Sequence, residues 1–107
     1  MMVIAEQELG QRGSDEAIRV QLFAPYQAAD QLSWICRFEI EAPIAHALNI
    51  HGETSLQALA LALKCLSASL YASDLYRRGD LGAFGEFGGY LGIPAPQMFL
   101  DEAPYPF

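Results

Sequence analysis

The sequence predicts an α+β fold, in which an antiparallel sheet of about four strands packs on one long helix. Three observations support this prediction. Short segments with alternating apolar residues occupy residues 1–53, and one leucine-rich segment of helical periodicity occupies residues 54–78. Residues 79–107 hold six of the nine glycines and four of the six prolines, which predicts an irregular tail. We expect the three parts to form a single domain, because 107 residues are enough for one hydrophobic core.

The first two predicted strands are Val3–Leu9 and Ala17–Ala24. Apolar and polar side chains alternate in both, so each strand should place one face on the core. Residues 10–16 between them are rich in glycine and aspartate, which favour turns, so the two strands should form a hairpin. The side chains of the second strand that should face the core are Ile18, Val20 and Leu22.

The third predicted strand, Trp34–Glu41, has the most regular alternation in the chain. Pro25 and Pro43 lie outside it, as expected for a residue that cannot donate a backbone N–H to a sheet. A weaker fourth strand is expected at Ala45–His51. Short connections favour an antiparallel meander with the helix across one face. The side chains of the third strand that should share the core face are Trp34, Cys36, Phe38 and Ile40.

Thr54–Arg78 is predicted to form one helix. Thr54 and Gln57 match the capping-box pattern at its start, and Gly79 is a natural stop at its end. Two other interpretations are a coiled-coil seam, whose heptad loses its leucines in the second half, and a membrane span, which the charged residues inside the segment disfavour. The leucines spaced alternately by three and four residues predict one buried stripe: Leu56, Leu59, Leu63, Leu66 and Leu70.

The length of this helix conflicts with the size of the sheet. A helix of about 24 residues is roughly 36 Å long, whereas four strands give a sheet roughly 15–20 Å wide. The helix should therefore run along the strands, break near residues 67–73, or extend beyond the sheet under cover of the tail or a second subunit. The tail, residues 79–107, is expected to wrap on the body with its aromatic rings in grooves beside the helix. The alternative is a tail that engages a partner.

The acidic composition limits the partners that the protein can have. With 13 acidic and 6 basic residues, the net charge of −7 argues against binding to nucleic acid or to anionic membranes. An acidic surface could instead face a basic protein partner. Cys36 and Cys65 are too few for a disulfide framework and lack zinc-site spacing, so two buried free thiols are expected. The start of the sequence lacks the pattern of a signal peptide, so we expect a cytoplasmic location.

No catalytic, cofactor-binding or metal-binding residue is predicted. His46 and His51 are separated by an odd number of positions on one strand, so they should lie on opposite faces and not share a metal. His51 and Glu53, beside the start of the helix, could form a small polar site near backbone amides that favour anions, and a capping contact is the alternative. Paired acids on one strand should be solvated. The residues expected to contact a partner or ligand are His51, Glu53, Tyr90, Glu39 and Glu41.

Residues 34–63 carry a family resemblance. The aromatic-rich strand WICRFEIE, a second strand, and a helix start of the type Gly-acid-x-Ser-Leu-Gln-Ala-Leu at Gly52–Leu59 resemble a family of small uncharacterised bacterial proteins. The usual aspartate before the serine is replaced here by Glu53-Thr54. The resemblance covers the chain up to about Gly79 and does not extend into the tail. It implies several strands before one leucine-rich helix and a bacterial origin, and it supplies no catalytic residues.

Three functions follow as expectations. The first is a non-enzymatic protein-binding module, similar to an immunity protein or an inhibitor, which acidity, small size and the lack of a catalytic constellation favour. It predicts a basic partner and binding that weakens as salt rises. The second is a small-ligand-binding protein or minor enzyme, with a pocket between helix and tail near His51, Glu53 and Tyr90. The third is a structural subunit, such as a homodimer, that acts through self-association of the helix.

Overall fold

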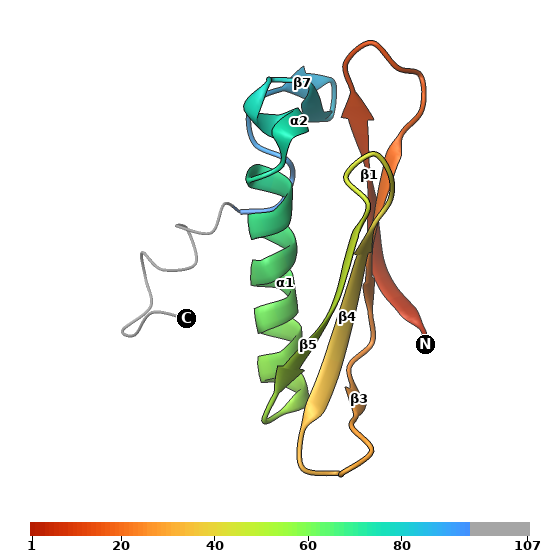
Figure 1. The fold of residues 1–107 in the computed structure, drawn as a ribbon, viewed down its shortest axis with the longest axis vertical. Helices are drawn as coiled ribbons and strands as arrows, with labels where there is room; N and C mark the ends of the chain where they lie inside the picture. The colour runs from red at the N-terminus through yellow and green to blue at the C-terminus, as the bar shows by residue number, and fades with distance from the viewer. Residues whose placement is uncertain (95–107) are drawn as a thin grey trace, which may run out of the picture.

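One antiparallel sheet and one main helix form two layers in the computed structural model, which describes residues 1–94 (Figure 1). The strands, in chain order, are β1 (Val3–Gln11), β2 (Ile18–Phe23), β3 (Tyr26–Gln27), β4 (Trp34–Ile40), β5 (His46–Gly52), β6 (Leu81–Ala83) and β7 (Glu86–Phe87). The helices are α1 (Ser55–Tyr71) and α2 (Asp74–Arg77). Across the sheet the order is β5-β4-β2-β1-β6-β7, and β3 pairs with β4 beyond the end of β2. The α+β class and the antiparallel sheet are confirmed.

The four long strands form where the alternation predicts them. In the β1–β2 hairpin Leu9 lies opposite Ile18, and both side chains are buried on the face that α1 covers. On β4, Cys36 and Phe38 are fully buried on the same face. Alternation decides the face because successive side chains of a strand point to opposite sides. The opposite sides of His46 and His51 are confirmed in the same way, since His46 pairs with Ile40 and His51 with Ile35.

The predicted count of about four strands is too low for the described chain. The three additional strands, β3, β6 and β7, have only two or three residues each, so they contain no alternation that a sequence pattern could reveal. Two of them form a hairpin in the glycine-rich segment. There Gly82 pairs with Phe87, and a Cβ atom on Gly82 would lie 2.1 Å from the Glu86 carbonyl oxygen. Glycine is therefore part of this hairpin and not a sign of irregular chain.

The single helix predicted over Thr54–Arg78 is wrong in its second half. Helix α1 begins as expected, with Thr54 Oγ1 accepting the N–H of Gln57 at 3.0 Å, but it ends at Tyr71. Ser73 then caps α2: its Oγ accepts from Tyr76 N at 3.3 Å and donates to Leu70 O at 2.7 Å. One serine thus satisfies backbone groups on both sides of the break. The break lies within residues 67–73, where a break was one of the three ways expected to resolve the conflict between helix length and sheet width.

The predicted stripe of leucines is also partly wrong. The α1 side chains that are buried are Ala58, Ala62, Leu66, Ser67 and Leu70. Leu56 is 72% exposed, and Leu59 and Leu63 are partly buried. The helix is rotated because its N-terminal turn approaches the sheet closely: a Cβ atom on Gly52 would lie 2.5 Å from Ala58 N. Only small side chains fit under that turn, so alanines occupy it and the leucines flank it.

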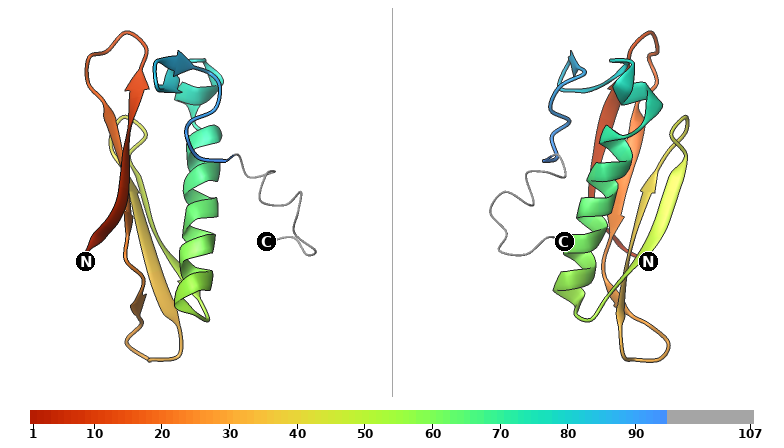
Figure 2. Two further views of the ribbon diagram at one scale, coloured as in Figure 1. Left: turned by 180° about the vertical axis from the view of Figure 1, so that it is seen from behind. Right: turned by 60° about the vertical axis from the view of Figure 1, so that its left-hand side comes forward.

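Residues 88–94 return along α1, as part of the predicted wrap requires (Figure 2). Tyr71 Oη donates to Ile93 O at 2.6 Å and accepts from Leu91 N at 3.0 Å, and Gln7 Nε2 donates to Leu91 O at 2.7 Å. Leu91 is fully buried. The described aromatic rings do not fill grooves, however, because Phe84 is 84% exposed and Tyr90 54%. The part of the predicted wrap beyond residue 94, with its further aromatic residues, lies outside the described chain.

Both cysteines are free thiols, and Cys36 is buried whereas Cys65 is partly exposed. Of the two expected buried thiols, only Cys36 is therefore fully enclosed. Neither described helix has the length and apolarity that crossing a membrane would require.

Candidate functional site

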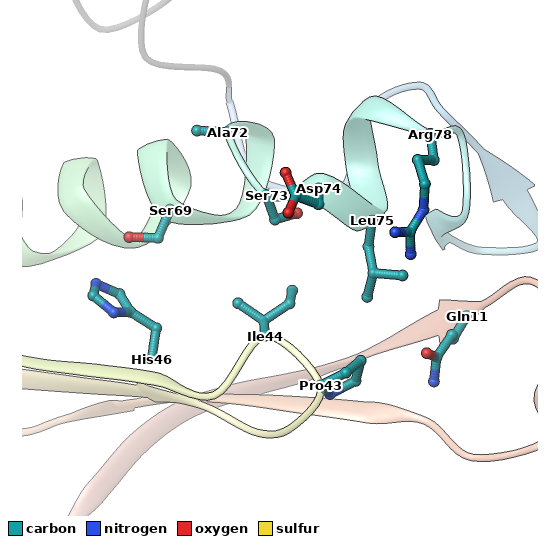
Figure 3. Close-up of a pocket in the computed structure, with 10 residues that line it drawn as sticks. All are labelled: Gln11, Pro43, Ile44, His46, Ser69, Ala72, Ser73, Asp74, Leu75 and Arg78. Carbon is teal, nitrogen blue, oxygen red and sulfur yellow. The ribbon is translucent and has the colours of Figure 1, made fainter.

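A cleft lies between the junction of the two helices and the turn that joins β4 to β5 (Figure 3). Its volume is about 610 Å³. The helical side provides Ser69, Ala72, Ser73, Asp74, Leu75 and Arg78, and the sheet side provides Gln11, Pro43, Ile44 and His46. The cleft exists because the chain turns at Ser73, which lifts α2 away from the line of α1 at the end of the sheet.

The β4–β5 turn shapes the floor of this cleft. Ala45 N donates to Glu41 O at 3.0 Å, and Ala45 takes a φ of 53°, which closes the turn tightly. Ile44 then points up toward the helices, between His46 at one end and the Leu75–Arg78 region at the other (Figure 3). The cleft therefore has an apolar middle and polar ends.

The polar groups of the cleft are mostly engaged in structural contacts. Ser69 Oγ donates to Cys65 O at 2.8 Å, and the Ser73 hydroxyl donates to Leu70 O. Both hydroxyl protons are thus committed to helix carbonyls and not directed at the His46 ring, which lies 5.9 Å from the Phe38 ring between centroids. Arg78 Nε is 3.3 Å from Asp80 Oδ2. This arrangement suits recognition of a ligand better than nucleophilic chemistry.

The thiol and phenol that lie in enclosed positions are held in their neutral forms. Burial raises the pKa of the Cys36 thiol, which donates to Phe23 O at 3.2 Å. Burial also raises the pKa of Tyr71, and the hydrogen bond from Leu91 N offsets part of that rise. A thiol must ionise to act as a nucleophile, so Cys36 is a packing residue. Within residues 1–94, no three His, Cys, Asp or Glu side chains are grouped so that they could hold a metal ion.

Two of the residues expected to contact a partner, Glu39 and His51, lie on the sheet face that α1 leaves uncovered, and Glu41 follows β4 at the border of that face. The register places Glu39 opposite Ala47 and His51 opposite Ile35 on that face. Glu39 Oε2 accepts from Arg37 Nε at 2.8 Å, and Glu41 Oε1 accepts from Arg19 N at 2.9 Å. A shallow depression of about 320 Å³ lies among the strand residues around Glu39 and Glu41.

The other two expected residues lie far apart. Glu53 is exposed beside the start of α1, and its backbone N–H donates to Gln57 Oε1 at 2.6 Å. Tyr90 lies near Tyr71, the last residue of α1. A helix of 17 residues is roughly 25 Å long. His51 and Glu53 therefore do not line one pocket with Tyr90, and contact of any of them with a partner stays a prediction.

Sequence reasoning missed the residues of the cleft. The one local signal was Ser73 followed by Asp74, which has the form of a second helix start. Recognising this signal would have predicted a break between two helices at Ser73. It would not have predicted that the break lies over Ile44 and His46.

The family comparison can now be set beside this geometry. The family model for a domain of unknown function, DUF6968, matches residues 5–95. The chain belongs to the DUF6968 family. The expected membership in an uncharacterised family is confirmed, whereas the helix-start motif and the bacterial origin stay predictions. The DUF6968 match continues past Gly79, so the expectation that the resemblance ends there is wrong. The β6–β7 hairpin and the residues that follow it are part of the family's domain. No curated protein and no solved structure matches the chain.

Proposed function

We propose that this DUF6968 domain is a non-enzymatic binding module that holds a basic protein partner on its outer face, in the manner of an immunity protein or an inhibitor. The outer face is the side of the sheet opposite α1. Its polar side chains are Glu6, Glu8, Arg19, Gln21, Arg37, Glu39, Asn49 and His51, and Ile35 and Ala47 lie among them. The observation that carries the proposal is that no described segment covers this face while α1 covers the other (Figure 2).

The charges of the outer face favour a basic partner. It carries three acidic side chains and two arginines, and Glu41 adds a fourth acid at its border. Arg37 is already engaged by Glu39 Oε2 at 2.8 Å and by Asn49 Oδ1 at 3.1 Å. Its charge is therefore neutralised within the protein, whereas the carboxylates of Glu6 and Glu8 on β1 take part in no ion pair of the described residues and are available to a partner. The strands hold these carboxylates at fixed spacing, so little conformational freedom is lost on binding.

Within residues 1–94, the lack of reactive groups in position to act on a substrate supports binding over catalysis. The serines of the cleft donate to helix carbonyls, and the Cys36 thiol is buried and neutral. An inhibitor needs only a complementary surface, whereas an enzyme needs a nucleophile or an acid–base pair in reach of a substrate.

The test is a capture experiment from lysate of the source cells at low and high salt, followed by binding of the purified candidate. The variant Glu6→Gln with Glu8→Gln removes two negative charges from the outer face and leaves the Arg37–Glu39 ion pair intact. The control, Asp15→Asn with Glu16→Gln, removes two from the β1–β2 turn. We expect a basic protein that binds the wild type and the control, and binds the outer-face variant at least about tenfold more weakly at low salt. Equal binding to both variants, or no captured protein, contradicts the proposal.

A second function is favoured by one specific observation, the cleft of about 610 Å³. Small-molecule sites have volumes of roughly 300–1,000 Å³ and combine an apolar lining with a few polar groups. The cleft has Ile44 at its middle, Leu75 toward one end and His46 at the other, so a small amphipathic ligand would fit its chemistry.

This second function is tested by amide NMR spectra against a fragment library. Binding should shift the amides of the β4–β5 turn and of α2, and His46→Ala should abolish the shifts. The control His51→Ala, on the other face of the same strand, should retain them. Fragments that shift only residues outside the cleft argue against it.

A further inference from the structure

The outer edge of β5 is an unpaired edge of the sheet. β5 pairs with β4 along all seven of its residues, from Gly52 opposite Trp34 to His46 opposite Ile40. In the part of the chain that the structure describes, no strand lies on the other side of β5. No backbone hydrogen bond joins residues 46–52 to any described segment except β4. The backbone groups on that edge are thus available to another strand.

This edge lacks the devices by which proteins protect edge strands. β5 contains no lysine, arginine, acid or proline, and its register with β4 has no bulge. The other three long strands all carry charge, namely Glu6 and Glu8 on β1, Arg19 on β2, and Arg37 and Glu39 on β4. The edge of β1 that faces away from β2 is also largely open, since β6 pairs there only with Gly10 and Gln11, but β1 carries Glu6 and Glu8. In a chain with a net charge of −7, β5 is therefore the long strand that combines an open edge with no formal charge. A second copy of the same acidic chain could approach there with the least repulsion.

The strand is also complementary to itself. In two antiparallel copies of β5 related by a two-fold axis, opposed side chains must point to the same face of the sheet. This holds only when the axis passes at a residue, which then lies opposite its own copy. Centring the pair on Asn49 uses all seven residues, whereas centring it on Leu48 or Ile50 uses five. With Asn49 at the centre, Leu48 lies opposite the partner's Ile50 on the helix side, and Ala47 lies opposite the partner's His51 on the outer face.

The pairing would cover apolar surface that is now exposed. Leu48 is 40% exposed although it lies on the same face of the sheet as α1. In the Asn49-centred pair it gains an apolar cross-strand neighbour, and such pairs are the unit of stabilisation between strands. At the centre, two Asn49 side chains face each other and can hydrogen-bond as amides.

We infer that the protein forms a symmetric dimer through antiparallel pairing of β5 with the β5 strand of a second copy, centred on Asn49. The two sheets become one continuous sheet with both α1 helices on one side. The two outer faces then lie next to each other on the opposite side. The inference stands on the edge geometry and is independent of the proposed function.

Disulfide trapping tests the register directly, in a Cys65→Ala background that leaves only the buried Cys36. Opposed residues in antiparallel strands have Cα atoms about 4.5–5.5 Å apart, within the range that a disulfide can bridge. Asn49→Cys should therefore cross-link with itself under mild oxidation. Ala47→Cys alone should not, but an equimolar mixture of Ala47→Cys and His51→Cys should. Equal cross-linking of Asn49→Cys and Ala47→Cys, as random collision would give, overturns the register.

Sedimentation equilibrium tests the dimer itself, with a monomer mass of 11.7 kDa as the reference. Asn49→Asp places two like charges opposite each other at the axis while keeping an acceptor for Arg37, and should weaken dimerisation roughly fivefold. Ala60→Glu adds the same charge at an exposed position of α1 and should leave dimerisation unchanged. A wild-type protein that sediments as a monomer at every accessible concentration, or equal weakening by both variants, refutes the inference.

Discussion

Replacing Gly52 by alanine tests the close contact between β5 and the start of α1. A Cβ atom there would lie 2.5 Å from Ala58 N, 2.8 Å from Ala58 Cα and 3.0 Å from Gln57 C. All three are backbone atoms of the first helical turn, so no side-chain rotation can relieve the overlap. Restoring an ordinary contact of 3.4 Å requires the helix start to move by roughly 0.9 Å over a packed core.

Two effects of opposite sign set the magnitude. Overpacking of this kind costs about 1–3 kcal/mol. Alanine also reduces the entropy of the unfolded chain, which stabilises the protein by about 0.4–1 kcal/mol because the backbone at Gly52 is not in the left-handed region. Because the overlap is with backbone atoms, we expect the upper half of the overpacking range, about 2–3 kcal/mol. The net loss in the free energy of unfolding should then be about 1–2.6 kcal/mol, which lowers Tm by roughly 5–20 °C in a domain of this size.

Urea unfolding at one fixed protein concentration measures this loss. Trp34 is the single tryptophan and lies opposite Gly52, so its fluorescence reports the site, and circular dichroism reports the whole fold. Gly89→Ala is the matched control, because a Cβ atom at Gly89 meets nothing within 4 Å. A loss for Gly52→Ala below about 0.5 kcal/mol, equal to that of the control, would refute the packing argument.

Three further predictions concern the helix start, the returning segment and the buried thiol. Thr54→Ala removes the acceptor for Gln57 N and should lower the free energy of unfolding by about 1 kcal/mol in urea titrations, whereas Thr54→Ser should retain most of it. Tyr71→Phe leaves Ile93 O and Leu91 N without their partner and should cost about 1–3 kcal/mol, with faster amide hydrogen exchange at Leu91 as the local readout. The raised pKa of Cys36 means that the unfolded thiol loses its proton first, so the contribution of this thiol to stability should be constant well below about pH 8.5 and should fall at higher pH. Cys36→Ala should reduce that fall, and an identical pH profile for both proteins would contradict the assignment.

The parts of the fold that could be predicted are those with a periodic signal. Alternation over six or more residues identified β1, β2, β4 and β5 and assigned Ile18, Phe38 and their neighbours to the core, because period two and burial of one face are tied together. Thr54 and Gln57 identified the helix start, because capping depends on residues close in sequence.

The parts of the prediction that failed depend on how two elements pack against each other, which the periodicity of either element does not contain. The rotation of α1 toward Ala58 and Ala62 follows from the approach of Gly52, which helical periodicity alone does not contain. The cleft needs the corner at Ser73 to lie over the β4–β5 turn, and that placement is set by packing across the sheet. Leucine content was therefore a poor guide to which side of the helix is buried, since shape decided it.

Because the helix covers only one side of the sheet, alternate residues of each strand lie in the core and the residues between them lie on the outer face. On β4, Cys36 and Phe38 are fixed by packing, whereas the alternate residues Arg37 and Glu39 are partly exposed and bond to each other, with Arg37 also bonding to Asn49. Mutations at the outer-face residues cost little stability, because they remove no buried contact. A lineage of such domains can therefore vary the charge and shape of its outer face at alternate positions of the same strands while its fold stays constant.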